Sequence, residues 1–287
     1  MPFSESQQRY LSDRFVEGTC PHCDFESARG DQCDNCGRTL DAEDLIDIRS
    51  KRDGSQLIFK DTTHQMFTLG SFQEQLEEWV ASRTDWRQNV RNQTLGMLRE
   101  GLRSRAMTRD IDWGVTVPLE GYENKRFYVW FEAVMGYLSA TKAWAENQGT
   151  PDEWKKFWVD PDGETYYFQG KDNVPFHTII WPAILMGYGG LNLPTDVVAN
   201  EYLNLGGADF SKSRGNAVWV PDFLSRYEAD PLRYYLASIM PESSDSEFTW
   251  AGFHAANNNE LVATFGNFVH RVLTITTRNF DDAVPTP

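Results

Sequence analysis

The chain has 287 residues, 40% of them hydrophobic and 24% charged, which is enough for one large domain or two to three small ones and argues against global disorder. Its 27 basic and 42 acidic residues give a net charge of −15, which argues against a broad nucleic-acid-binding face and fits equally an adaptation to a salt-rich cytoplasm. No apolar run approaches the about 18 residues of a membrane span, and the start, MPFSESQQRYLSDRF, lacks the apolar region of a signal peptide, so we predict a cytoplasmic protein with no membrane partner.

All four cysteines lie in the stretch CPHCDFESARGDQCDNC, with the spacing Cys20-x2-Cys23-x9-Cys33-x2-Cys36. Each Cys-x-x-Cys turn places two thiolates on one side of the chain, and two such turns supply the four sulfurs of a tetrahedral zinc site. Two disulfides are the alternative, which a reducing cytosol and the strain of a bridge within such a turn disfavour. Because no ligand position is left open, the zinc would be structural. We expect His22 to be a surface residue rather than a fifth ligand.

Short strands and helices are predicted for the segment after the cysteines. A helix that Ser71 caps is predicted over 71–82. Residues 84–107 predict a longer amphipathic helix, because apolar side chains recur there at helical spacing. Two β-like runs precede these helices and a loop follows them: QLIFK (56–60), HQMFTL (64–69) and TRDIDWGVTVP (108–118).

From residue 126 the pattern alternates between strands and helices. The order strand, helix, strand, helix, strand implies right-handed crossovers and a parallel sheet, so we predict an α/β fold. Ligands of such sheets bind beyond the carboxyl ends of the strands, where Gly170-Lys171-Asp172 and a glycine loop at 206 follow. The predicted elements are a strand over 126–131, a helix over 132–149, a strand over 164–170, a helix over 174–187 and a strand over 196–205.

Both of these loops carry residue types that suit a nucleotide. Glycine lets the backbone approach a ligand closely, and a carboxylate such as Asp172 can accept both ribose hydroxyls. The alternative is that Asp172 caps the following helix. In GGADFSKSRGN (206–216), Lys212 stands on a glycine-flanked loop and can reach a phosphate, where positioning and positive charge promote phosphoryl chemistry. A solvated basic loop is the alternative there.

The motif FSKSRGN resembles the second signature, KMSKS, of class I aminoacyl-tRNA synthetases. The motifs FYVWFEA, GKDNVPFH, TRDIDWGV and ADPLRYYL, together with the four-cysteine knuckle after LSDRFVEGTCP, are similar to methionyl-tRNA synthetases in particular. The resemblance runs from about residue 8 to residue 280. Isoleucyl-, leucyl- and valyl-tRNA synthetases share the lysine loop, but this chain has no room for their editing insertion.

This resemblance implies ATP-dependent activation of methionine to methionyl-adenylate and its transfer to tRNA, with magnesium on the ATP and one structural zinc. For the fold it implies the second half of a nucleotide-binding, Rossmann-like parallel sheet, a zinc-knuckle insert and the start of an α-helical bundle. The implied domains are a connective insert domain over 1–114 with the knuckle at about 17–40, the C-terminal half of the nucleotide-binding catalytic domain over 115–200, a linker region with the SKS loop over 201–256, and the first helix of the anticodon-binding bundle over 257–287.

The resemblance also implies site residues. Lys212 and Arg109 match catalytic positions near the ATP phosphates, and Gly170 and Asp172 match residues that hold the adenosine ribose. The other matches are Ser211 and Ser213 beside Lys212 for ATP, Trp130, Ala133, Tyr137 and His177 for the wall of the methionine pocket, and Asn267 and Arg271 for the tRNA anticodon. An aromatic wall suits the polarisable thioether of methionine. Core packing is the alternative for the aromatic residues, and an ordinary polar helix face is the alternative for the anticodon pair.

The chain departs from the family pattern at several positions. No His-x-Gly-His signature occurs, Asp209 replaces the first lysine of the loop signature, and Val134 stands where a proline is common. At about 4 to 6 Å from a phosphate, the exchange of lysine for aspartate would cost several kcal/mol before screening.

From these departures we expect a fragment that lacks the N-terminal half of the catalytic domain and most of the anticodon-binding domain, is inactive alone and needs a separate N-terminal half. The alternative is a non-catalytic remnant that binds zinc and tRNA or a partner protein. A zinc-knuckle interaction module is a weaker option, because it would not need the GKD and SKS motifs.

Overall fold

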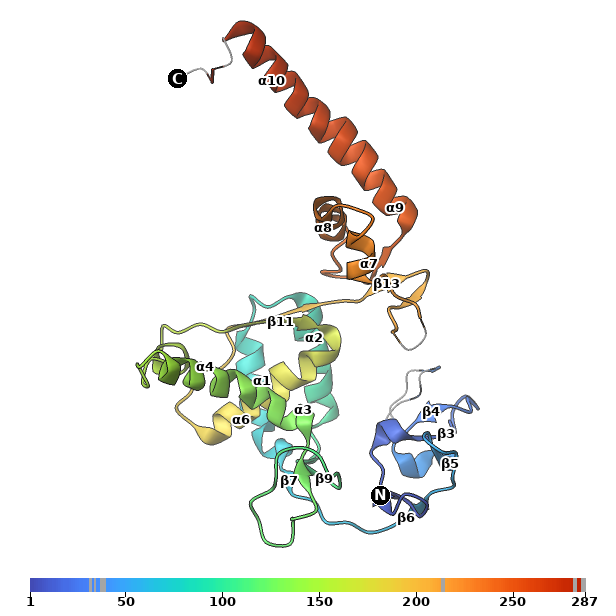
Figure 1. Cartoon of the computed structure of the whole chain (residues 1–287). Helices are drawn as coiled ribbons and strands as arrows, with labels where there is room; N and C mark the ends of the chain where they lie inside the picture. Colours follow the sequence, from blue (N-terminus) through green and yellow to red (C-terminus); the bar gives the residue numbers. More distant parts are fainter. Residues whose placement is uncertain (31–32, 34, 37–39, 213–214, 281–282, 285–287) are drawn as a thin grey trace. The chain divides into compact units, whose positions relative to one another are not determined.

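The structure is a computed structural model that describes residues 1–287 except 31–32, 34, 37–39, 213–214, 281–282 and 285–287 (Figure 1). It divides into two compact units, each assembled from segments that are distant in the sequence. The first unit comprises Met1–Thr84, Gln93–Thr165 and Pro175–Thr195, and the second comprises Asp85–Asn92, Tyr166–Val174 and Asp196–Pro287.

Short antiparallel strands build the amino-terminal part of the first unit. They form two three-stranded sheets, in the orders β2-β1-β6 and β4-β3-β5, around a small apolar core that includes Leu11 and Val16. A Cβ at Gly18 would lie 2.8 Å from the carbonyl oxygen of Ile46, so β3 needs a glycine to lie this close to β5. The strands are β1 (Pro2–Ser4), β2 (Arg9–Tyr10), β3 (Val16–Thr19), β4 (Ala28–Arg29), β5 (Ile46–Ser50) and β6 (Ile58–Phe59).

The rest of the first unit is mainly helical. In α1 (Gln73–Ser82), the side chains of Leu76, Trp79 and Val80 are buried at the spacing of an amphipathic helix. A π-helical turn, Phe176–Ile180, leads directly into α6 (Trp181–Tyr188). The other helices are α2 (Gln88–Glu100), which begins in the second unit, α3 (Val129–Glu132), α4 (Gly136–Asn147) and α5 (Lys155–Trp158). Two antiparallel pairs join β7 (Met66–Phe67) to β8 (Arg105–Ala106) and β9 (Thr108–Arg109) to β10 (Arg126–Phe127).

Two small sheets organise the second unit. β11 (Tyr166–Gly170) and β12 (Asp196–Asn200) pair in parallel, with Gly170 opposite Asn200. β13 (Leu203–Leu205) pairs in parallel with β15 (Ser246–Phe248) and antiparallel with β14 (Ala208–Asp209). The chain therefore leaves one sheet at the end of β12 and enters the other at β13.

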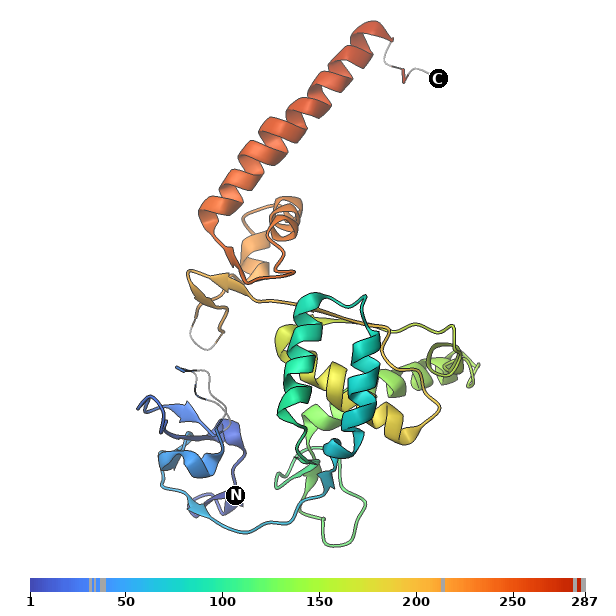
Figure 2. The same ribbon diagram turned by 180° about the vertical axis from the view of Figure 1, so that it is seen from behind.

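Helices complete the second unit. α7 (Val220–Leu224), α8 (Ala229–Ser238) and α9 (Trp250–Ala255) enclose an aromatic core with β15. The buried aromatic residues of that core are Phe223, Tyr235, Phe248 and Phe253. From α9 the chain continues through the π-helical residues Ala256–Gly266 into α10 (Asn267–Asn279), and the three form one long helical segment (Figures 1 and 2).

The mixed helix and strand content agrees with the predicted α/β class, and the parallel pairing of β11 with β12 confirms the strand order predicted between residues 164 and 200. The strand predicted over 126–131 was wrong. Only β10 forms there, it pairs antiparallel with β9, and α3 begins at Val129. A short apolar run has no period that separates a strand from a buried helix, so tertiary packing decides.

Three other boundaries differ from the prediction. The strand predicted over 196–205 is two strands in different sheets, because the chain changes partners at Glu201 and Tyr202. The helix predicted over 84–107 ends at Glu100, before Gly101 takes a φ of 81°. Ser71 lies in a 3-10 turn rather than capping α1, and no side-chain hydrogen bond caps that helix. Within the described ranges, none of the helices combines the length and apolarity that a bilayer crossing requires.

Candidate functional site

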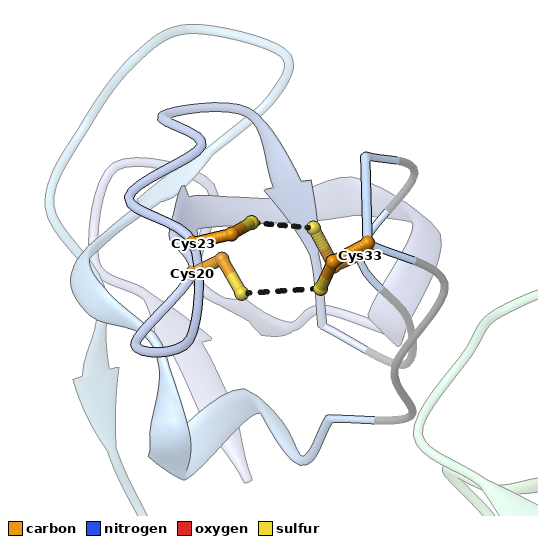
Figure 3. Close-up of side chains that lie close together, drawn as sticks. Cys20, Cys23 and Cys33 are labelled. Atoms are coloured by element: carbon orange, nitrogen blue, oxygen red, sulfur yellow. Dashed lines mark hydrogen bonds between the residues drawn. The ribbon is translucent and has the colours of Figure 1, made fainter.

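The four cysteines converge on one point, and Figure 3 shows the sulfur atoms of Cys20, Cys23 and Cys33 directed toward it. Cys20 follows β3, and its amide donates to the Phe25 carbonyl oxygen at 2.9 Å, which closes the first turn. The Sγ atoms of Cys20 and Cys36 lie 3.9 Å apart, and those of Cys23 and Cys33 lie 3.6 Å apart. All four sulfurs lie within 4.8 Å of one another, and both measured separations are well beyond the about 2.05 Å of a disulfide bond, which favours a shared metal over two disulfides.

These separations fit a zinc ion. A tetrahedron with Zn–S bonds of about 2.3 Å has sulfur–sulfur edges of about 3.8 Å, close to both measured pairs. Cys20 and Cys33 are buried in the apolar core of this region, whereas Cys36 is exposed. The predicted site residues of the knuckle are therefore brought together as expected.

Nearby N–H groups favour the thiolate form that a metal requires. The His22 amide donates to Cys20 Sγ at 3.4 Å, and the Asn35 side-chain amide donates to Cys23 Sγ at 3.6 Å. The Asn35 hydrogen bond and the backbone of Phe25 lower the pKa of Cys23 to about 6. The His22 side chain is exposed and is not among the clustered ligands, which agrees with its prediction as a surface residue.

In the first unit, Tyr137 and His177 form a hydrogen-bonded aromatic pair. Tyr137 lies in the first turn of α4 and His177 in the π-helical turn, with the Tyr137 hydroxyl 2.8 Å from His177 Nε2 and ring centroids 5.6 Å apart. His177 is buried, whereas Tyr137 is 43% exposed. Burial raises the pKa of Tyr137, so its hydroxyl stays protonated at neutral pH. The pair therefore presents a partly accessible aromatic wall.

Trp130 and Ala133 extend this wall along the chain. Trp130 lies in α3 and is 44% exposed, and its ring packs tilted by 40°, at a centroid distance of 6.2 Å, against Phe176, the residue that precedes His177. Ala133 is exposed and lies one helical turn before Tyr137. Sequence reasoning missed Phe176, although its place next to His177 in GKDNVPFH was a usable signal. The π-helical turn itself is a feature often found at functional sites.

Arg109 lies beside the start of α3. Its guanidinium group lies 4.1 Å from the centre of the Tyr128 ring, and Nη1 donates to the carbonyl oxygens of Ala106 and Thr108 at 2.9 and 3.0 Å. Tyr128 is two residues from Trp130, so Arg109 is anchored close in sequence to the aromatic wall. A guanidinium held by carbonyl oxygens and a ring keeps its positive charge, because neither neutralises it.

A buried polar cluster follows Arg109. The Lys125 ammonium group contacts Asp110 and donates to Thr62 Oγ1 at 2.7 Å, and His64 Nε2 lies 3.3 Å from Asp110. Arg126 lies opposite Arg109 in the antiparallel pair of β9 and β10, so Lys125 and Asp110 occupy the next position of the same register. Sequence reasoning missed this cluster, because its members lie far apart in the chain.

The second unit contains Gly170 and Asp172 at the end of β11. A Cβ at residue 170 would lie 2.8 Å from Asp172 Oδ1, so glycine leaves room for that carboxylate at the strand end. Asp172 is exposed in the 3-10 turn Lys171–Asn173, and no side-chain hydrogen bond caps that turn. The exposed carboxylate is accessible to a ligand.

The lysine loop (206–216) forms a hairpin in its described residues, 206–212 and 215–216, and lies in the same unit. Ser211 and Asn216 exchange backbone hydrogen bonds of 2.8 and 3.0 Å, and the Asn216 side chain donates to the Leu205 carbonyl oxygen at 3.0 Å. Gly206 and Gly207 have φ angles of 64° and 77°, which L side chains rarely adopt. Lys212 is exposed next to Ser211.

Three further predicted positions complete the description. Ser213 lies outside the described residues. Asn267 is the first residue of α10 and Arg271 lies one turn later, and both are exposed. The predicted methionine residues thus belong to the first unit, and the predicted ATP residues that the structure describes belong to the second.

Comparisons with known proteins agree on one family. The sequence profile of the tRNA synthetases class I (M) matches residues 1–273. The methionine–tRNA ligase of Dehalococcoides mccartyi is 58% identical over 274 residues, covering 96% of this chain and 49% of that protein. The ligase of Thermomicrobium roseum is 54% identical over 286 residues, covering 99% and 49%.

Solved structures agree with this result. Mycobacterium tuberculosis methionyl-tRNA synthetase in complex with methionyl-adenylate superposes with a TM-score of 0.69 at 26% identity, over 87% of this chain and 48% of that one. The chain spans about half the length of the relatives it matches.

Proposed function

Because the chain belongs to the class I tRNA synthetase (M) family, we propose that it contributes to the methionine-activating site of a methionine–tRNA ligase. The single observation that carries this proposal is the 58% identity to a curated methionine–tRNA ligase along 96% of the chain. In the proposed reaction, a carboxylate oxygen of methionine attacks the α-phosphorus of ATP, the α–β phosphoanhydride bond breaks and pyrophosphate leaves. A ribose hydroxyl of tRNA then attacks the methionyl carbonyl carbon, and AMP leaves.

For methionine, the proposal assigns the binding wall to Trp130, Ala133, Tyr137 and His177. Aromatic faces and edges interact favourably with a thioether sulfur. The Tyr137–His177 hydrogen bond at 2.8 Å supports this role, because it holds both rings in place. Arg109, anchored on Tyr128, supplies positive charge toward the carboxylate or the phosphates.

For ATP, the proposal assigns the ribose to Gly170 and Asp172, and the phosphates to Lys212 with Ser211 and Ser213. The Lys212 ammonium group would stabilise the charge that develops on the leaving pyrophosphate. Magnesium bound with ATP would neutralise part of the phosphate charge. Asn267 and Arg271, exposed on one turn of α10, are proposed to contact the tRNA anticodon.

For the knuckle, we propose one structural zinc held by Cys20, Cys23, Cys33 and Cys36. Sulfur separations of 3.6 and 3.9 Å support this assignment. With four thiolate ligands, the zinc would contribute folding free energy and no open coordination position for catalysis.

The test is methionine-dependent exchange of pyrophosphate into ATP. It is run on the 287-residue chain and on the same chain joined behind the N-terminal half of the Dehalococcoides relative. Tyr137→Phe should raise the methionine KM about 3- to 10-fold, because a lost hydrogen bond to a buried partner costs about 0.5 to 1.5 kcal/mol. Tyr234→Phe, which removes from α8 a hydroxyl that donates to Glu260, is the matched control and should not change that KM. The absence of methionine-dependent exchange in both proteins would refute the proposed function.

A further inference from the structure

Lys171, the middle residue of the Gly170-Lys171-Asp172 motif, is the candidate that the proposed function leaves without a role. Its ammonium group lies 2.8 Å from Glu201 Oε2 and 2.7 Å from Asp245 Oδ1. It also lies 4.3 Å from the centre of the Tyr202 ring. Two carboxylates and one ammonium leave this cluster with a net charge of −1, so Lys171 has little charge to offer a phosphate.

Each carboxylate of this cluster is held by a second donor. Asp245 Oδ1 accepts the Tyr202 backbone N–H at 2.8 Å, and Glu201 Oε1 accepts the Asn89 side-chain amide at 2.9 Å. Burial by itself lowers the pKa of Lys171, but the hydrogen bonds that its ammonium group donates to Asp245 and Glu201 outweigh it, and the net pKa is raised. The pKa values of both carboxyl groups are lowered, chiefly by Lys171. The three groups therefore stabilise one another as ions.

The cluster links the two parts of the predicted ATP site. Lys171 directly follows β11, which ends at Gly170, while Asp245 directly precedes β15. β15 pairs with β13, and β13 runs into the lysine hairpin. Two further contacts tie the hairpin to this sheet: the Gly207 N–H donates to Glu247 Oε1 at 2.6 Å, and the Asn216 side chain donates to the Leu205 carbonyl oxygen at 3.0 Å. A continuous set of contacts thus runs from the strand end that carries Asp172 to the hairpin that carries Lys212.

We propose that Lys171 is a positioning residue that aligns the ribose-binding strand end with the phosphate-binding lysine hairpin, by bridging Glu201 and Asp245, and that it is not itself a phosphate ligand. The part of this proposal that concerns ATP rests on the proposed function. Its specific consequence is that losing the bridge harms the use of ATP while leaving the methionine wall in the first unit unaffected.

The structural half of the proposal is tested on the 287-residue chain by amide hydrogen exchange. Lys171→Met and Asp245→Asn should both speed exchange about tenfold at the backbone amides of residues 203–205, 211 and 216, since the sheet that holds the hairpin loses its link to β11. Lys171→Arg should keep the protection, because a guanidinium group can bridge two carboxylates. Lys156→Met, which breaks an exposed 2.7 Å pair with Glu153 in the first unit, is the control and should leave these amides unchanged. Unchanged protection in Lys171→Met would overturn the proposal whatever the activity of the protein.

The kinetic half is tested by methionine-dependent pyrophosphate exchange, in whichever of the two proteins described under the proposed function shows that exchange. Lys171→Met and Asp245→Asn should each lower kcat/KM for ATP about tenfold, and the double variant should lose no more than either single variant, with the methionine KM unchanged. A large loss in Lys171→Met with none in Asp245→Asn would mean that the lysine acts on the phosphates directly, and would overturn the proposal. If the unaltered protein shows no methionine-dependent exchange, the proposed function fails, and the hydrogen-exchange result still decides whether Lys171 is the link.

Discussion

The cysteine cluster and the Lys171 cluster each bring together groups that become negatively charged when they ionise, but the two clusters balance that charge differently. The four thiols lie within 4.8 Å of one another and include no cation, so the group is stable as thiolates only with an added metal ion. Glu201 and Asp245 are brought together around Lys171, at 2.8 and 2.7 Å, and need no added ion. Under the proposed zinc assignment, the cysteine region would need an added ion to fold, whereas the Lys171 cluster carries its own counter-charge.

The largest effect is expected for the cysteine cluster. Cys33→Ser should abolish zinc binding and unfold the β3–β5 region, because the apparent binding free energy of structural zinc is about 10 to 16 kcal/mol and exceeds what so small a core supplies. His22→Ala, which alters an exposed neighbour, should keep about one zinc per chain. Metal analysis combined with hydrogen exchange of residues 16–50 measures both. Undiminished zinc in Cys33→Ser would disprove the four-sulfur site.

A smaller effect is expected for the buried pair Asp110–Lys125. This pair tests whether burial increases the loss of folding free energy when a cluster that contains its own cation loses it. Their side chains are only 12% and 11% exposed. Lys125→Met should lower the free energy of unfolding by about 3 to 5 kcal/mol, because it leaves a buried carboxylate without its cation. Lys155→Met, from a pair whose side chains are 52% and 81% exposed, should cost about 1 kcal/mol or less. Urea denaturation followed by fluorescence measures both, and equal losses would contradict the role of burial.

The smallest effect is expected in the pH dependence, where the two clusters should separate. The folded pKa values of Glu201 and Asp245 are lowered, so their stabilisation is complete above the unfolded values of about 4.3 and 3.9 and is lost as the pH falls through the lower folded values. Metal-bound thiolates compete with protons at higher pH, so zinc should leave first. A titration from pH 7 to 3 that follows zinc release and exchange at residues 203–205 measures the order. Glu201→Gln should reduce the loss of protection at residues 203–205 that occurs at the lower pH. Simultaneous loss of zinc and of this protection would argue against a difference between the two clusters.

How much could be predicted from the sequence depended on the distance between interacting residues. The paired Cys-x-x-Cys turns predicted a cluster that the structure contains, because each turn is formed within a few residues. The helices over 71–82 and 132–149 were largely correct, since their apolar spacing is local. The strand predicted over 126–131 failed, because a run that is apolar throughout fits a buried helix as well as a strand.

The same dependence on sequence distance applies to the site residues. The sequence motifs named Tyr137 and His177 through resemblance, but only the fold placed them 2.8 Å apart, 40 residues from each other in the chain. Asp110 and Lys125 had no pattern of their own to mark them, and Phe176 had only its place beside His177. Their importance follows from partners that packing supplies.

By itself the sequence determined the thiol cluster, the alternation of strand and helix between residues 164 and 200, and the loops that carry Gly170, Asp172 and Lys212. Only the tertiary structure decided that Lys171, between two predicted ATP residues, pairs with Glu201 and with Asp245, 74 residues away. The physical reason is that a local pattern reports which conformations the backbone prefers, whereas ion pairs between distant residues form only after the sheets have assembled and brought their ends together.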